Sequence, residues 1–427
     1  MKTKFTLLIL SIYFTQVTFS QDYYLHCGKI LDSKSGKIAT NQTIIVTKNK
    51  ISKIIDGFVP KQNPQDIEIN LKNKFILPGL IDLHVHIEGE RNPHYYVSKY
   101  VDNEADIAFE STRYAEVTLL AGFTTVRDLG GTGVNISLRN AINRGLVKGP
   151  RIYTAGKAIA TTGGHADPTN GSNRKLVGDP GPHEGVINSP DEAAKAVRER
   201  YKEGADVIKI TATGGVLSVA KSGKNPQFSS DEIKAITTTA KDYNMLTAAH
   251  AHGDEGMQRA ILGGIKTIEH GTFMSEETME LMKKYDAYLV PTLTAGKEVE
   301  KNAEINGFYP DIVVPKAKEV GPQIKATFAK AYKKGVKIAF GTDAGVFPHG
   351  INAKEFGYMV DGGMSALEAI QSATITNAML LGIDKEVGQI KESFFADIIA
   401  VDDNPLQVIK TLEKVVFVMK DGKIYKN

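Results

Sequence analysis

Two histidines one residue apart end an apolar stretch in the first quarter of the chain. The stretch is GLIDLHVHIEGE, and the two histidines are His84 and His86. Alternate side chains of a β-strand lie on the same face, so both imidazoles could approach a single metal ion. An HxH pair alone is a weak signal, because solvated or hydrogen-bonded histidines are common. Its interpretation depends on the rest of the chain.

Four more residues that could do chemistry lie in or at the end of predicted strands. They are Lys209 in VIKIT, His250 in AAHAHG, His270 in IEHGT and Asp343 in FGTDAG. Each has a plain structural alternative: a histidine can be a hydrogen-bonded core residue, an aspartate can cap a helix, and a lysine can extend to solvent. Six such residues at one end of a fold favour a shared site instead. Imidazole and carboxylate ligands suggest zinc, although manganese, cobalt or iron could bind the same set.

Lys209 is the least expected of these residues, because its strand is apolar on both sides of it. An ammonium ion cannot bind a metal, and burying one without a partner is costly. A carboxylate partner would remove that cost. Reaction with carbon dioxide would also remove it, because the resulting carbamate is an anion whose two oxygens could bridge two cations. The sequence is compatible with both.

The central part of the chain alternates strands and helices in an order that would bring these residues together. SPDEAAKAVRERYKEG predicts a helix capped by Ser189 or Asp191 and ended by Gly204, and SSDEIKAITTTAKDYN repeats the pattern. Eight strand–helix units predict an α/β fold, a (β/α)8 TIM barrel over residues 79–384 with its chemistry at the C-terminal strand ends. An open doubly wound sheet is the alternative. The predicted strands are 81–84, 124–128, 151–156, 207–211, 246–250, 267–270, 287–292 and 336–341.

Both ends of the chain have the pattern of β structure. Residues 21–78 contain alternating segments with a turn at 48–50, and residues 385–427 end in a hairpin signal at Asp421-Gly422. We therefore predict that the two termini together form one small β-sandwich domain beside the barrel.

The first twenty residues have the pattern of a secretory signal peptide. Lys2 and Lys4 precede a short apolar core, and small or polar residues follow up to Ser20. We expect an exported protein, periplasmic or extracellular, with no stable membrane span after cleavage; an uncleaved anchor is the alternative. Cys27 is the only cysteine, which excludes an intramolecular disulfide. The net charge of +3 gives no reason to expect nucleic-acid binding, and a homo-oligomer is compatible with the sequence.

Taken together, the motifs resemble those of the amidohydrolase superfamily, specifically its binuclear members with a carbamylated lysine. The resemblance extends over nearly the whole chain after the predicted signal peptide and includes the sandwich made from both termini. The matching segments are LPGLID, HVH (84–86), IKITATGG (208–215), AAHAHG (248–253), IEHGT (268–272) and GTDAG (341–345).

This resemblance implies a centre of two divalent metal ions, expected to be Zn²⁺, bridged by a carbamate on Lys209 and by a hydroxide. The hydroxide would attack the scissile carbonyl. Asp343 would be catalytic as well as a ligand, because it could accept the hydroxide proton and pass it to the leaving amine. The implied ligands are His84, His86 and Asp343 for one ion, and His250 and His270 for the other.

Three segments resemble the branch that contains Xaa-Pro dipeptidases, namely 156–168, 209–218 and 248–256. The resemblance implies that His165 and His252 bind the substrate, and that His252 helps to hold its carboxylate. Relatives often have tyrosine at this second position. The alternatives are a loop histidine for His165 and a group that orients His250 for His252. Arg127, in TTVRDLGG, is interpreted as a structural partner of an aspartate.

We therefore expect a small-molecule hydrolase that cleaves amide bonds, in dipeptides or in N-acyl amino acids with a free carboxylate. A hydrolase of cyclic amides, similar to imidazolonepropionase, or a lactonase would use the same metal centre. A catalytically silent binding protein on the same scaffold is the alternative outside enzymes.

Overall fold

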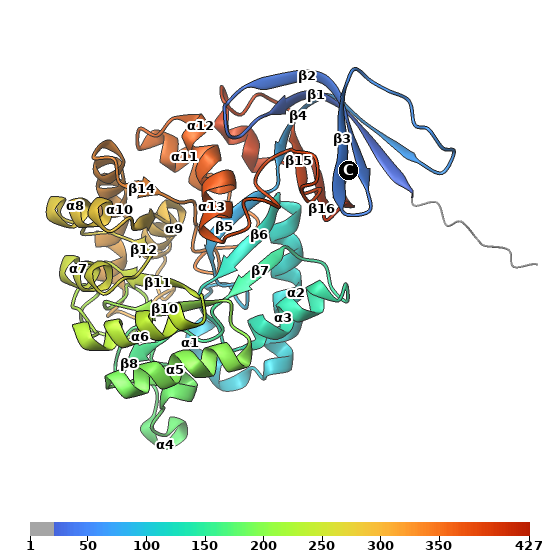
Figure 1. Ribbon diagram of the computed structural model, residues 1–427. Coiled ribbons are helices and arrows are strands. Elements are labelled where there is room, and N and C mark those ends of the chain that lie inside the picture. The colour runs from blue at the N-terminus through green and yellow to red at the C-terminus, as the bar shows by residue number, and fades with distance from the viewer. Residues whose placement is uncertain (1–20) are drawn as a thin grey trace, which may run out of the picture.

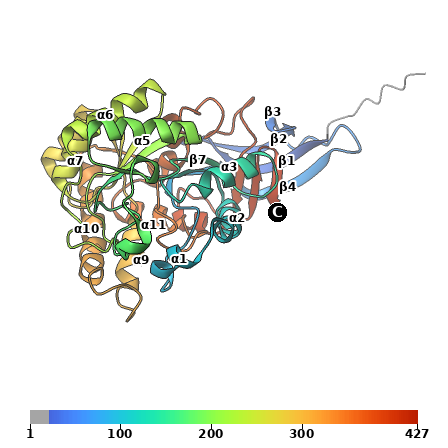
Figure 2. The same ribbon diagram turned by 90° about the horizontal axis from the view of Figure 1, so that it is seen from below.

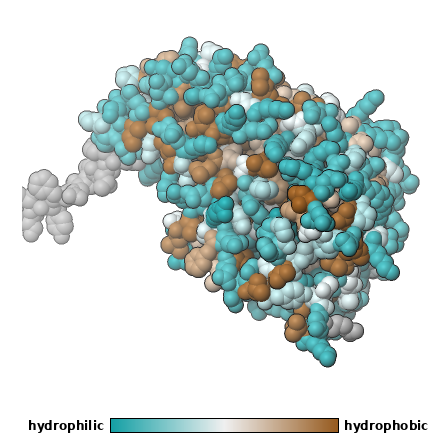
Figure 3. Space-filling view, turned by 180° about the vertical axis from the view of Figure 1, so that it is seen from behind, coloured by the Kyte–Doolittle hydropathy of each residue, from teal (hydrophilic) through white to brown (hydrophobic). Residues whose placement is uncertain are grey.

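The computed structural model describes residues 21–427, so the predicted signal peptide lies outside the described residues. Figure 1 shows a barrel of strands surrounded by helices, with a β-rich part attached at one side. The view from below in Figure 2 shows the strands of the two termini gathered beside the barrel. Figure 3 shows one outer face, where hydrophilic side chains dominate and hydrophobic ones are scattered. From residue 21 onward, no helix is both long and apolar enough to cross a bilayer.

The barrel consists of eight parallel strands. β5, β6 and β7 form one run of paired strands, and β10 to β14 form another. Parallel bridges between Ile159 and Ile210, and between Val85 and Ala344, join the two runs and close the barrel. The predicted (β/α)8 barrel is thus confirmed, and the open sheet is wrong. The strands are β5 (Leu80–Val85), β6 (Phe123–Asp128), β7 (Arg151–Thr154), β10 (Val207–Thr211), β11 (Leu246–Ala251), β12 (Thr267–His270), β13 (Tyr288–Val290) and β14 (Lys337–Ile338).

Local sequence explains where the outer helices begin and end. Helix α5 begins after Ser189, whose side chain accepts a hydrogen bond from the backbone N–H of Glu192, and ends at Gly204 with φ +94°. Ser229 and Glu232 form a capping box at α6. The helices are α1 (Tyr95–Val101), α2 (Glu104–Leu120), α3 (Val134–Asn143), α4 (Arg174–Val177), α5 (Pro190–Glu203), α6 (Ser230–Asp242), α7 (Asp254–Leu262), α8 (Glu276–Lys284), α9 (Leu293–Asn302), α10 (Val314–Lys333), α11 (Lys354–Asp361), α12 (Ala366–Gln371) and α13 (Asn377–Leu380).

Short elements fill several connections. Two 3₁₀ turns, one π-helical turn and a two-stranded sheet lie in loops between the longer elements. They are η1 (Pro182–Glu184), η3 (Ile409–Glu413), η2 (Ser372–Thr376), β8 (Ala160–Thr161) and β9 (Val186–Ile187).

The two termini build a single seven-stranded sheet in the order β17-β16-β15-β4-β1-β2-β3. The N-terminal and C-terminal halves meet where β4 pairs with β15 in antiparallel register. The sheet folds over on itself, because the N–H of Ile51 in β3 donates to the carbonyl of Phe394, just before β15, at 2.9 Å. The strands are β1 (Asp22–Leu31), β2 (Ile38–Thr47), β3 (Lys50–Asp56), β4 (Ile67–Pro78), β15 (Ile398–Val401), β16 (Phe417–Lys420) and β17 (Lys423–Lys426).

Candidate metal centre

One end of the barrel gathers all six residues that the sequence predicts as metal ligands. They lie at the C-terminal ends of β5, β10, β11 and β12 and in the loop after β14. Together they line one cavity of ≈ 1170 Å³, and His165 and His252 line it as well. The barrel therefore brings together side chains that are up to 260 positions apart in the sequence. The lining ligands are His84, His86, Lys209, His250, His270 and Asp343.

Three of these residues form a tight group around one carboxylate oxygen. The Nε2 atoms of His84 and His86 each lie 3.3 Å from Oδ1 of Asp343. Within residues 21–427, the buried atoms His84 Nε2 and Asp343 Oδ1 have no hydrogen-bond partner. A cation between them would satisfy both atoms, and nitrogen and carboxylate donors suit a divalent transition metal. The group therefore fits a metal ion.

The protonation of His84 and Asp343 suits metal binding. Burial alone would lower the pKa of His86, but its contact with Asp343 outweighs burial and raises that pKa. Burial lowers the pKa of His84 to about 4, so that its imidazole is neutral at neutral pH. Burial alone would raise the pKa of Asp343, but the neighbouring His84 and His86 hold it well below its usual range. Neutral imidazole and ionised carboxylate are the forms that bind metals.

A second group consists of three histidines. Ligand atoms of His250, His252 and His270 all lie within 4.8 Å of one another. Burial is the main cause that lowers the pKa of each ring, to about 4 for His252 and well below the usual range for the other two. The group could therefore also hold a divalent metal. The family resemblance implies that His252 lies by the substrate, and the structure places it against the predicted ligands, with its ring centroid 4.6 Å from that of His250 and 4.9 Å from that of His270.

Hydrogen bonds orient these rings. His250 donates from Nε2 to the carbonyl of Gly214 at 3.1 Å, which leaves its Nδ1 available. Nδ1 of His270 lies 2.7 Å from the hydroxyl of Thr292, which leaves its Nε2 available. Such contacts fix which ring nitrogen faces a metal. His270, Thr292 and Asp343 all have positive φ, at +72°, +51° and +62°, a conformation that non-glycine residues adopt at a cost of about 1–3 kcal/mol.

Lys209 is 3% exposed and forms no ion pair among the described residues. Burial lowers its pKa to about 8, against the opposing charges of Glu269 and Asp343. The lowered pKa increases the share of the neutral amine at neutral pH relative to an ordinary lysine, and the neutral amine is the form that acts as a nucleophile. The sequence leaves two explanations for this buried lysine, a carboxylate partner or a carbamate. In the described structure no carboxylate pairs directly with Lys209.

Two supporting residues were missed or misread from the sequence. Glu269 accepts a hydrogen bond from Nδ1 of His84 at 2.9 Å, and its other oxygen accepts one from Arg127 at 2.9 Å. Arg127 is therefore a structural partner as expected, but of a glutamate and not an aspartate. The signal for Glu269 was a carboxylate directly before His270 in a short apolar strand, where burial requires a partner.

His165 packs against the second group. Its ring stacks on that of His250, with centroids 4.3 Å apart and an angle of 29° between the planes, and its Nδ1 is buried without a hydrogen-bond partner in the described part of the chain. This approach requires a glycine at Gly215, because a Cβ there would lie 2.1 Å from Cε1 of His165. Burial, with a contribution from His252, lowers the pKa of His165 to about 3.

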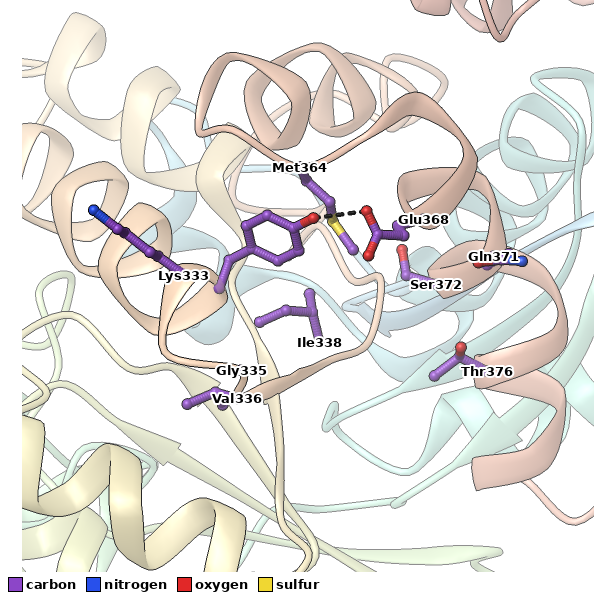
Figure 4. Close-up of a pocket in the computed structure, with 10 residues that line it drawn as sticks. Lys333, Gly335, Val336, Ile338, Met364, Glu368, Gln371, Ser372 and Thr376 are labelled. Carbon is purple, nitrogen blue, oxygen red and sulfur yellow. Dashed lines mark hydrogen bonds between the residues drawn. The ribbon is translucent and has the colours of Figure 1, made fainter. Parts of the chain in front are cut away.

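A second cavity of ≈ 480 Å³ lies at the other end of the barrel, beside β14 (Figure 4). In this cavity the hydroxyl of Tyr332 donates to Glu368 at 2.6 Å. None of the predicted site residues lines it. We assign no function to it.

Comparisons with known proteins agree with this geometry. Residues 75–425 match the model of the Amidohydrolase family. Ochratoxinase from Aspergillus niger is 31% identical over 409 residues, which is 92% of this chain and 84% of the relative. A crystal structure of a Xaa-Pro dipeptidase with bound methionine in the active site superposes with a TM-score of 0.92 and 52% identity, covering 95% of this chain and all of that one. A prolidase complexed with N-methylphosphonate-L-proline has a TM-score of 0.87 and 31% identity, with coverage of 95% and 100%.

Proposed function

The chain belongs to the amidohydrolase family, and on that basis we propose that it hydrolyses the amide bond of dipeptides or N-acyl amino acids that carry a free carboxylate. The observation that supports the reaction type is the gathering of six potential metal ligands around the mouth of one cavity. The observation that supports the substrate class is 52% identity over the whole length of a Xaa-Pro dipeptidase. We propose a preference for Xaa-Pro-type dipeptides within that class.

The ligands of the proposed centre are those that the sequence predicts. His84, His86 and Asp343 would hold one Zn²⁺, His250 and His270 the other, and carbamylated Lys209 would bridge the two. When bound, two divalent cations supply a water nucleophile at neutral pH and polarise a carbonyl oxygen. Asp343 lies among the candidate ligands and is ionised, which is the form that would accept a proton from the attacking water and return it to the leaving nitrogen.

The side chains around the centre would bind and orient the substrate. We propose that His165, whose Nδ1 has no hydrogen-bond partner among residues 21–427, donates to a substrate oxygen, and that His252 lies close to the substrate carboxylate. Apolar residues make up another part of the cavity wall and would take an uncharged side chain. They are Val216, Leu217, Ala295, Val299, Val320 and Ile324.

An assay with purified protein tests this function. We expect bound divalent metal, and hydrolysis of Xaa-Pro, other Xaa-Xaa or N-acyl amino acid substrates that is lost on chelation and restored by Zn²⁺. A screen that includes hydantoins and lactones separates the alternatives. Turnover of those compounds without turnover of dipeptides would replace the proposal by a cyclic-amide hydrolase or lactonase, and metal binding without any turnover would favour a silent binding protein.

We also propose that the protein is exported, since residues 1–20 have the pattern of a signal peptide. Expression of the full chain in a bacterium, followed by cell fractionation and N-terminal sequencing, should give a product outside the cytoplasm that starts near Gln21. An intact Met1 in the cytoplasmic fraction would contradict export.

A further inference from the structure

An arginine lies at the edge of the metal centre without an acidic partner among the described residues. Arg91 follows β5 and lines the same cavity as the candidate ligands. Its backbone N–H donates to the carbonyl of Gly345 at 2.7 Å, two residues beyond Asp343. This bond ties Arg91 to the loop that carries a candidate ligand, so its side chain starts close to the reacting groups.

The guanidinium of Arg91 is held by aromatic rings and not by a carboxylate. It lies 3.4 Å from the ring centroid of Tyr95 and 5.9 Å from that of Tyr96. The hydroxyl of Tyr96 donates to the carbonyl of Leu217 at 2.9 Å, which fixes this ring across the cavity. Stacking on an aromatic ring restrains a guanidinium while its N–H groups stay available for an anion.

The nearby carboxylates are already engaged elsewhere. Glu88 accepts from the backbone N–H groups of Thr132 and Asn135, at 2.6 Å each. Glu90 accepts from the backbone N–H of His349 at 2.8 Å. Accordingly, Arg91 forms no ion pair within 4.0 Å among residues 21–427. A planar fork of N–H donors without a protein anion, beside a substrate cavity, matches the geometry of a carboxylate.

Two lysines of the cavity wall, Lys99 and Lys157, are less suited than Arg91 to binding a substrate anion. Nζ of Lys99 is used by the protein, since it donates to Asn170 O at 3.1 Å and to Ser172 Oγ at 2.7 Å. Lys157 lies in the loop after β7. The pKa of Glu184 is lowered mainly by the hydrogen bond from the backbone of Gly181, and the charge of Lys157 lowers it further. Arg91 lines the same cavity as His165 and the candidate ligands.

We propose that Arg91 binds the free carboxylate of the substrate and is the residue that makes the enzyme select acids over their amides. This inference rests on the proposed function, because it names the group that recognises one end of that substrate. It also gives the half-buried guanidinium the anion that the protein itself does not supply.

Binding of L-methionine and of L-methioninamide to the metal-loaded chain tests the proposal without requiring turnover. Calorimetry should show that the wild-type protein prefers the acid. Arg91→Met should weaken acid binding by about 10- to 100-fold, because a charge-assisted bidentate contact is lost, and should leave amide binding unchanged. Arg91→Lys should give an intermediate loss. Lys157→Met is the matched control and should leave both affinities unchanged, with metal content and melting temperature equal in all variants.

Several results would overturn this role. They are equal affinity of the wild type for acid and amide, an equal loss of both ligands in Arg91→Met, or loss of acid selectivity in Lys157→Met. The proposed function fails separately. If the acid selectivity depends on Arg91 but no dipeptide or N-acyl amino acid is hydrolysed, the anion site stands and the enzymatic assignment falls.

Discussion

Nδ1 of His84 lies 2.9 Å from Oε2 of Glu269, and both side chains are buried in the interior of the barrel. The contact fixes the proton of the imidazole on Nδ1 and turns Nε2 toward Asp343. Arg127 holds the other oxygen of Glu269, so an arginine, a glutamate and a histidine form one buried chain that ends at the candidate metal centre. The ligand and its support come from strands on different parts of the barrel.

Glu269→Gln should therefore weaken metal binding by about 10- to 100-fold, because the support of a ligating histidine is altered and Arg127 loses its anion. Competition with a chromophoric chelator measures this affinity. Glu276→Gln is the control, since Glu276 is an exposed carboxylate that pairs with Lys330 and Lys334 on the barrel surface. Unchanged metal affinity in Glu269→Gln would show that the chain of contacts does not orient His84.

The same carboxylate predicts a pH dependence of stability. Burial alone would raise the pKa of Glu269, but Arg127 and His84 outweigh it and lower the pKa to about 2. The unfolded chain therefore binds more protons than the native chain below the ordinary pKa of 4.5. The contribution of ionised Glu269 to the free energy of unfolding is complete above pH 4.5 and is lost as the pH falls from 4.5 toward 2. Melting temperatures of metal-free protein between pH 6 and 3 should fall more steeply for wild type than for Glu269→Gln, and parallel curves would refute this.

Lys209→Ala should lose bound metal, and its amide hydrolysis should fall by more than the about 100-fold that removal of a supporting hydrogen bond costs. The reason is that Lys209 lies buried among the candidate ligands without a counter-ion in the described structure. Metal analysis and the amidase assay measure both effects. Short carboxylic acids, which fit the space that the lysine side chain leaves, should restore part of both if a carbamate is needed. Lys195→Ala, on the outer helix α5, should change neither, and full activity in Lys209→Ala would contradict a bridging role.

Gly215→Ala should lower kcat/KM by about 100-fold with little change in melting temperature. A methyl group at this position would lie 2.1 Å from His165, so the histidine must move away from His250. The control in the same loop is Gly223→Ala, where the nearest atom to an added Cβ is 3.5 Å away. Equal activity of the two variants would mean that His165 has no part in the reaction.

Much of the fold follows from local sequence patterns. Alternating strand and helix signals predicted eight units, and the structure has eight barrel strands close to the predicted positions. The last predicted strand, 336–341, is an exception, since β14 covers only Lys337–Ile338. Beyond β14 the chain leaves regular strand geometry and bonds to β5, with Asp343 N–H donating to the carbonyl of His84 at 2.7 Å.

Local sequence is enough to place these residue types at the strand ends, and the general rule that parallel strands end at one mouth of a barrel groups them. Three further contacts follow from tertiary packing: Glu269 supports His84, His252 lies against His270, and Arg91 stacks on Tyr95 above the cavity. These contacts depend on the register of neighbouring strands and on the path of long loops. Both are set by packing between residues far apart in the chain, so no local pattern records them.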